Sequence, residues 1–291
     1  MDMPVDFGLS THLFHAEPLA ARHFDAIAAH GFGAVEVFAT RSHVDYHRAA
    51  TGRDLAAWCR DAGLRLHSVH APIVEFLRGT TWGPAFSTAT THAAQRVRAV
   101  DECTRALALA EHAPFDYFVL HLGVPDEYAP PTGDNQRDAV LRTLETLRPL
   151  CEQAGVTLAV EVIPNALSTA RQLVRLIEDE ELSDLGICLD VGHARLQGDV
   201  VDALETVAGY LVTTHLHDNR GRADDHLLPF DGVIDWAELL TAFQKVGYDG
   251  TLLFELAAGP DGAGATLQGA GSVRRRFEQL LGADDLNFSE A

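Results

Sequence analysis

Short apolar segments alternate with longer amphipathic segments along the whole chain. The apolar segments are rich in β-branched and aromatic residues, a composition typical of buried strands. They cover Val5–Ser10, Gly33–Phe38, Leu64–His70, Asp116–His121, Val156–Val162, Leu185–Asp190, Leu211–His217 and Gly250–Leu256. The segments with a helical period include Pro18–His30, Thr90–His112, Gln136–Ala154, Thr169–Glu178 and Trp236–Val246. The pattern predicts eight strands that alternate with helices.

Strands that alternate with helices pair in parallel, and eight such units close into a (β/α)8 barrel, or TIM barrel. Glycines that can end a helix precede several predicted strands, at Gly31, Gly63, Gly155 and Gly247. The segment GLSTHLFHAEP after the first strand is no glycine-rich phosphate loop, which argues against an open dinucleotide-binding sheet and a nucleotide cofactor. We therefore expect an α/β fold with a single domain over residues 1–291 and a solvated acidic tail from about residue 282.

The charge and the cysteines restrict the class of protein. The chain has 42 acidic and 22 basic residues and a net charge of −20, which argues against duplex DNA as a substrate. No apolar run is long enough for a membrane helix, and the N-terminus does not resemble a signal peptide. The 4 cysteines are scattered and form no CxxC pair. These features predict a cytoplasmic protein with reduced thiols and no membrane partner.

Metal-binding residue types recur at the C-terminal ends of the predicted strands or just beyond them. Each alone could be a hydrogen-bonded core residue, but the parallel strands of a barrel bring all of them to one mouth. So many buried carboxylates and imidazoles need cations to offset the cost of desolvation and repulsion. Imidazole and carboxylate without thiolate suit zinc or manganese. The candidate ligands are His70, His121, Glu161, Asp190, His193, His215, Asp224, His226 and Glu255.

This strand-end pattern resembles that of the xylose-isomerase-like barrels, which include endonuclease IV and the sugar (phosphate) isomerases and epimerases. The resemblance extends from VDFGLS to LLFEL and covers nearly the whole chain. Likeness to endonuclease IV implies three metal ions, with Glu161 as a bridge between the first two. It assigns His70 and His121 to the first ion, Asp190, His215 and Glu255 to the second, and His193, Asp224 and His226 to the third.

Likeness to the isomerases and epimerases implies a single ion, held by Glu161, Asp190, His215 and Glu255. The loop HLHDNRGRADDHL after the seventh strand, followed by DGVIDW, is more similar to this branch. Its usual PGxG stretch reads Pro229-Phe230-Asp231-Gly232 here, so Phe230 replaces a glycine. Because phenylalanine rarely adopts the positive φ angles that glycine allows, the sequence does not predict the backbone conformation at this position.

Three functions remain open on the sequence alone. Hydrolysis of a phosphoester in a small, sugar-phosphate-like molecule uses all the candidate ligands and is the function that the sequence favours. The alternative is isomerisation or epimerisation of a sugar or sugar phosphate, in which Glu161 and Glu255 exchange a proton as base and acid. A non-catalytic sugar- or metal-binding barrel is disfavoured because the ligand set is intact.

Five further residues are predicted to contact a substrate: His12, Glu36, His217, Arg220 and Arg222. Arg78 is another candidate contact for an anion. Trp82, in the loop after the third strand, could cover the face of a sugar. Barrels of this kind often pair through loops on the active-site side, so a homo-oligomer is compatible with the sequence, which does not itself fix the oligomeric state.

Overall fold

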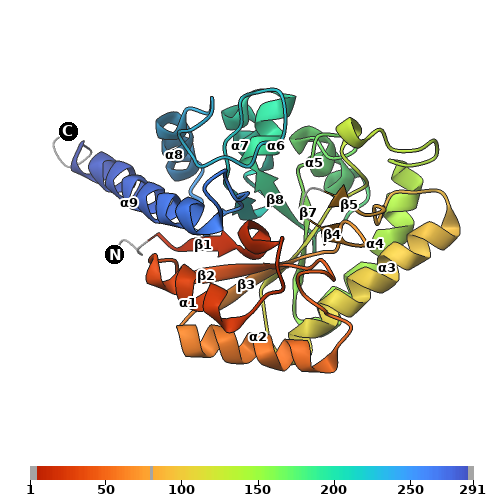
Figure 1. The fold of residues 1–291 in the computed structure, drawn as a ribbon. Coiled ribbons are helices and arrows are strands. Elements are labelled where there is room, and N and C mark those ends of the chain that lie inside the picture. Colours follow the sequence, from red (N-terminus) through yellow and green to blue (C-terminus); the bar gives the residue numbers. More distant parts are fainter. Residues whose placement is uncertain (1–4, 79–80, 288–291) are drawn as a thin grey trace.

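A circle of parallel strands forms the centre of the computed structural model, which describes residues 5–78 and 81–287 (Figure 1). The eight-stranded sheet has the order β10-β1-β2-β3-β6-β7-β8-β9. Between β9 and β10, Leu216 N donates to Leu253 O at 2.7 Å and Glu255 N donates to Leu216 O at 3.2 Å, which closes the circle. The strands are β1 (Phe7–Ser10), β2 (Ala34–Phe38), β3 (Arg65–His70), β6 (Tyr117–Leu120), β7 (Thr157–Glu161), β8 (Gly186–Asp190), β9 (Leu211–His215) and β10 (Leu252–Phe254). The predicted TIM barrel is confirmed.

Helices cover the outside of the barrel (Figure 1). They are α1 (Ala21–Ala29), α2 (Ala49–Ala62), α3 (Ala93–Leu107), α4 (Arg137–Ala154), α5 (Ala170–Asp179), α6 (Val191–Gln197), α7 (Val200–Val207), α8 (Trp236–Lys245) and α9 (Ala263–Asn287). Gly63 and Gly155 end α2 and α4 with φ values of 71° and 69°, as their positions in the sequence predict. Alternate strand residues such as Val35 and Val37 join the apolar core, and the residues between them face the barrel interior.

Two segments that follow strands on the C-terminal side of the barrel are partly regular. The segment after β3 contains a hairpin of β4 (Leu77–Arg78) and β5 (Thr81–Trp82). The glycine-rich segment after β10 is a loop only up to the start of α9 at Ala263. Its low helix propensity is overridden by packing, because Gly269 lies against Leu228 and Phe277 is fully buried.

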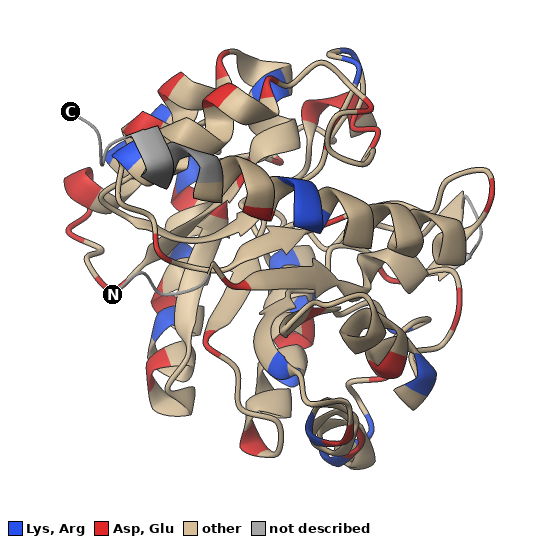
Figure 2. Ribbon diagram, turned by 90° about the vertical axis from the view of Figure 1, so that its left-hand side faces the viewer, with Lys and Arg blue, Asp and Glu red and all other residues tan. Residues whose placement is uncertain are grey.

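The expected acidic tail also begins as helix, since α9 continues to Asn287. Residues 288–291 lie outside the described residues. All four cysteines are buried and free, as predicted. Acidic and basic residues are both spread over the outer helices and loops (Figure 2). Across residues 5–78 and 81–287, no helix has both the length and the apolar character that a bilayer span requires.

Candidate metal centre

The predicted ligands meet at the C-terminal mouth of the barrel. His70, Glu161, Asp190 and His215 are the last residues of β3, β7, β8 and β9, and Glu255 directly follows β10. Within each group that follows, the potential ligand atoms lie within 4.8 Å of one another. The groups are His70, His121 and Glu161; Glu161, Asp190, His215 and Glu255; and His193, His217, Asp224 and His226. The structure thus brings together all the residues that the strand-end pattern singled out.

Glu161 joins the first two groups. Its Oε2 atom lies 3.1 Å from His70 Nε2 and 3.0 Å from His121 Nε2. Its other oxygen, Oε1, lies 3.1 Å from His215 Nδ1. The side chain is fully buried. The two oxygens therefore face separate sets of imidazoles, an arrangement suited to bridging two cations.

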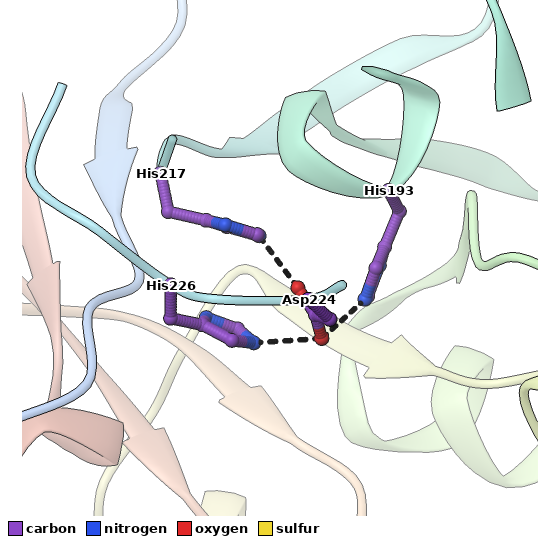
Figure 3. A group of neighbouring side chains, drawn as sticks. All are labelled: His193, His217, Asp224 and His226. Carbon is purple, nitrogen blue, oxygen red and sulfur yellow. Dashed lines mark hydrogen bonds and ion pairs between the residues drawn. The ribbon is translucent and has the colours of Figure 1, made fainter. Parts of the chain in front are cut away.

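The third group is centred on Asp224, in the loop after β9 (Figure 3). Asp224 Oδ2 lies 3.0 Å from both His193 Nε2 and His226 Nε2. His193 is in the first turn of α6, whose N-cap residue Asp190 accepts a 2.6 Å hydrogen bond from the His193 backbone N–H. His217 Nε2 lies 3.8 Å from Asp224 Oδ1 and 2.9 Å from Asp190 Oδ2. His217 thus connects the third group to the second.

The ring of His217 occupies the space in which a side chain at position 192 would lie. A Cβ atom built on Gly192 would lie 2.0 Å from His217 Cε1. On its other side, the His217 ring is stacked on that of His226, with centroids 4.0 Å apart. His217 is therefore confined between α6 and the loop after β9.

Most of the candidate histidine ligands are oriented by backbone carbonyls. The Nδ1 atoms of His70, His193 and His226 lie 2.8, 3.1 and 3.0 Å from the carbonyl oxygens of Ala71, Val162 and Glu255. A carbonyl accepts, so each Nδ1 donates and each Nε2 presents a lone pair to the centre when the ring is neutral. Metal-binding histidines are commonly fixed in this way.

The pKa values reflect the mutual stabilisation of carboxylates and imidazoles. Burial alone would raise the pKa of Glu161, but the neighbouring His121 and His215 hold that pKa well below its usual range. Burial alone would lower the pKa of His70, yet the hydrogen bond and charge of Glu161 raise it to about 9. The pKa of His226 is likewise raised to about 10, against the effect of burial, by Asp224. Without a cation His70 and His226 hold protons at positions that metal ions would take.

The residues present fit a divalent metal. The donors are imidazoles and carboxylates, which suit zinc or manganese. Asp224 Oδ1 and His217 Nδ1 are buried without a hydrogen-bond partner, and a cation would compensate a buried acceptor of this kind. The Cys188 thiol forms a further group with Glu161 and His215 that the sequence did not suggest. Burial raises the pKa of this thiol, which favours its protonated form.

A cavity of about 500 Å³ opens above the centre. Its inner end is lined by His70, His121, His193, Asp224, His226 and Glu255. Its outer wall is largely apolar and includes Phe38, Ile73, Val124 and several prolines. At the rim, the rings of Trp82 and Tyr128 lie 6.1 Å apart and are 41% and 53% exposed. A small molecule in this cavity would contact the metal ligands at one end and apolar side chains at the other.

The predicted substrate contacts are placed in different surroundings. His12 lines the cavity, with Nδ1 3.0 Å from the carbonyl oxygen of Leu256. Glu36 and His217 are fully buried and are not among the cavity-lining residues: Glu36 contacts the candidate ligand His215, and His217 contacts Asp190 and belongs to the third ligand group. Arg220 and Arg222 are exposed on the loop after β9, also outside the cavity lining. The side chain of Arg78 lies outside the described side chains.

Asp134 is a cavity residue that the sequence patterns missed. It is buried and lines the cavity. It accepts hydrogen bonds from the Ser87 hydroxyl and, at 2.7 Å, from the Asn135 backbone N–H. It lies in the long loop after β6, where no strand or helix period marks the inward-facing positions. Only its place in a long loop on the active-site side could have drawn attention to it.

Asp218 anchors the loop that carries Asp224 and His226. This buried carboxylate accepts hydrogen bonds from Trp236 Nε1 at 2.8 Å and from the backbone N–H groups of Phe230 at 3.1 Å and Val233 at 3.0 Å. Phe230 has a φ of 78° and so adopts the left-handed conformation that a glycine would take. The substitution in the PGxG-like stretch therefore leaves a glycine-like backbone conformation at this position.

Sequence comparison with known proteins identifies relatives that agree with the TIM-barrel fold. The family model described as xylose isomerase-like TIM barrel matches residues 24–276. An uncharacterised protein from Sinorhizobium fredii is 31% identical over 212 residues, 67% of either chain. One from Methanocaldococcus jannaschii is 27% identical over 266 residues, 87% of this chain and 84% of the relative. A D-psicose 3-epimerase from Ruminiclostridium cellulolyticum is 26% identical over 122 residues, 39% of this chain and 40% of the enzyme.

Solved structures share the fold over almost their whole length. A D-tagatose 3-epimerase-like protein superposes with a TM-score of 0.77 and 22% identity, over 96% of this chain and 99% of the other. An L-ribulose 3-epimerase superposes with a TM-score of 0.75 and 18% identity, over 99% and 98% of the two chains.

Proposed function

The chain belongs to the xylose isomerase-like TIM barrel family, and on that premise we propose that it is a divalent-metal-dependent enzyme that isomerises or epimerises a sugar or a related small molecule. The observation that carries the proposal is the group of Glu161, Asp190, His215 and Glu255, in which two glutamates belong to one buried set of ligands and one of them, Glu255, lines the cavity. The relatives named as epimerases of D-psicose and L-ribulose support this reaction class over the phosphoester hydrolysis preferred from the sequence.

The chemistry follows from the positions of the two glutamates. A bound divalent ion supplies polarisation of the carbonyl and hydroxyl oxygens of the substrate. Glu255 lines the cavity, which supports its proposed role as the carboxylate that takes a proton from a carbon next to that carbonyl. Glu161, deeper and fully buried, completes the ligand group and is the second residue proposed for proton exchange.

The cavity wall favours a neutral substrate over a phosphorylated one. Among the described side chains that line the cavity, none belongs to lysine or arginine. Asp134 adds a further carboxylate, and a carboxylate accepts hydrogen bonds from hydroxyl groups but repels phosphate. These features support a sugar-like polyol as the substrate class.

Proton exchange with solvent provides the test. The zinc- or manganese-loaded protein is incubated with unphosphorylated ketoses in D2O, and deuterium at the carbon next to the carbonyl is followed by NMR. We expect incorporation by the wild type and none by Glu255→Gln. Phosphate release from sugar phosphates, without deuterium incorporation into any ketose, would contradict the proposal.

Phosphoester hydrolysis is the second candidate because the structure holds further ligand groups beside the one that an epimerase needs, among them the group of His70 and His121 and the group around Asp224. Adjacent divalent ions can generate hydroxide and orient a phosphate. The number of bound ions discriminates between the two functions. Close to three zinc or manganese ions per chain would favour hydrolysis, and one ion would exclude a three-ion mechanism.

A further inference from the structure

Glu36 lies in the interior of the barrel, one layer below the cavity. It shares the inward face of β2 with Phe38, which lines the cavity, but is itself 0% exposed. A β-bulge beside Glu36 brings Ser68 of β3 opposite it. The Ser68 hydroxyl donates a 2.8 Å hydrogen bond to Glu36 Oε2. The carboxylate is therefore held in place from the β3 side.

The same oxygen of Glu36 faces His215. Glu36 Oε2 lies 3.1 Å from His215 Nε2. An ionised carboxylate can only accept, so this nitrogen carries the proton. The other ring nitrogen of His215, Nδ1, lies 3.1 Å from Glu161 Oε1 and 3.6 Å from Glu255 Oε2. Nδ1 is thus the His215 atom that faces the candidate metal centre.

His215 is oriented in the opposite sense to the other anchored ligands. His70, His193 and His226 present Nε2 to the centre and are held at Nδ1 by backbone carbonyls. His215 presents Nδ1 and is held at Nε2 by a buried carboxylate. A carboxylate that accepts from a ligand imidazole fixes its tautomer and makes it a stronger electron donor to the metal.

We propose that Glu36 is a positioning residue of the metal centre, which keeps His215 protonated at Nε2 so that Nδ1 offers its lone pair to the divalent ion. The inference rests on the proposed metal centre. It gives Glu36 a role different from the substrate contact predicted from the sequence, because the side chain acts through His215.

Metal affinity tests the proposal without an activity assay. Metal-free wild type, Glu36→Gln and Glu36→Leu are titrated with Co²⁺, followed by its visible absorption, and with Zn²⁺ in competition with a chelator. Glutamine keeps an acceptor but loses the charge, whereas leucine removes both. We expect affinity to fall by about 10- to 100-fold in Glu36→Leu and by less in Glu36→Gln.

Glu102→Gln is the matched control. Glu102 is also a buried glutamate, and its Oε2 lies 2.8 Å from His47 Nε2, but it is outside the described ligand groups. The Glu102→Gln variant should bind metal with the same affinity as the wild type. If Glu36→Leu does not fold, Ser68→Ala replaces it, because loss of the Ser68 hydroxyl releases Glu36 and should lower the affinity in the same direction.

The tautomer of His215 gives a second readout. The measurement is long-range ¹H–¹⁵N NMR of the zinc-loaded, ¹⁵N-histidine-labelled protein, in which the His215 signals are assigned with the His215→Ala variant. The wild type should carry the His215 proton on Nε2. The Glu36 or Ser68 variant should show a smaller population of this tautomer. A wild type that binds no ion would refute the proposed function itself. If the wild type binds metal and the Glu36 and Ser68 variants have the same metal affinity and the same His215 tautomer, the proposed role of Glu36 is wrong.

Discussion

His70 Nε2 lies 3.1 Å from Glu161 Oε2 inside the barrel, where both side chains are almost completely buried. In the metal-free protein a proton on His70 makes this an ion pair, which is why the pKa of His70 is raised to about 9 despite burial. A metal ion between the two residues would displace that proton. The protonation of the centre should therefore depend on whether metal is bound.

This relationship predicts how the stability of the metal-free protein depends on pH. The folded pKa values of His70 and His226, about 9 and about 10, lie above the unfolded value of 6.5. Their stabilisation is fully present below about pH 6.5 and is lost as pH rises toward 9 and 10. Urea unfolding of the metal-free protein should show falling stability from pH 6.5 to 9. The zinc-loaded protein should keep its stability over this pH range, because its ligand imidazoles are already neutral. An equal decline in stability in both forms would show that the protons on His70 and His226 are not its cause.

Substitution of His193 or Asp224 should separate the two candidate reactions. Each belongs to the third ligand group, with 3.0 Å between His193 Nε2 and Asp224 Oδ2. His193→Ala or Asp224→Ala should weaken a single-metal epimerase, but abolish a hydrolase that needs the third ion. Metal content is measured beside the rates. Full hydrolase activity in either variant would contradict the role of the third group.

Asp218→Ala should destabilise the protein by about 3 kcal/mol or more, because the indole N–H of Trp236 and several backbone N–H groups would lose their buried acceptor. Thermal or urea unfolding measures the loss. Asp225→Ala is the control, since Asp225 is in the same loop and accepts from the exposed Arg220 backbone N–H. Equal stability of the two variants would show that Asp218 does not anchor the loop.

The aromatic rim of the cavity should contribute to substrate binding. Trp82→Ala or Tyr128→Ala should raise KM by about 2- to 10-fold, with a smaller effect on kcat, because an aromatic contact contributes about 0.5–1.5 kcal/mol beyond its buried area. Val97→Ala, at a residue that is 66% exposed and outside the cavity lining, is the control. An unchanged KM in both rim variants would remove the rings from the binding site.

The hydrophobic pattern predicts the barrel because it shows eight strands that alternate with helices. It also predicts that the candidate metal ligands meet, because parallel strands bring their C-terminal ends to one mouth of the barrel. Strand alternation also predicts that Glu36 faces inward, but not how deep it lies. Depth depends on the stagger of neighbouring strands and on the bulge beside Glu36. For that reason the sequence predicts Glu36 as a substrate contact, although its side chain lies outside the cavity lining and contacts the candidate ligand His215.

The remaining differences arise where tertiary contacts override local preference. The glycine-rich start of α9 has a loop-like composition, yet it packs as a helix against Leu228 and the barrel exterior. Asp134 lies in a segment without a period, so only the folded loop shows that it reaches the cavity.

The fit of His217 against Gly192 makes these two positions interdependent during sequence divergence. A side chain at 192 would have to displace the imidazole, since its first carbon would lie 2.0 Å from that ring. Among related sequences we expect the identities at the two positions to covary, with an imidazole at 217 accompanied by glycine at 192. A library that randomises one position alone would recover few functional chains, so the pair is best varied together.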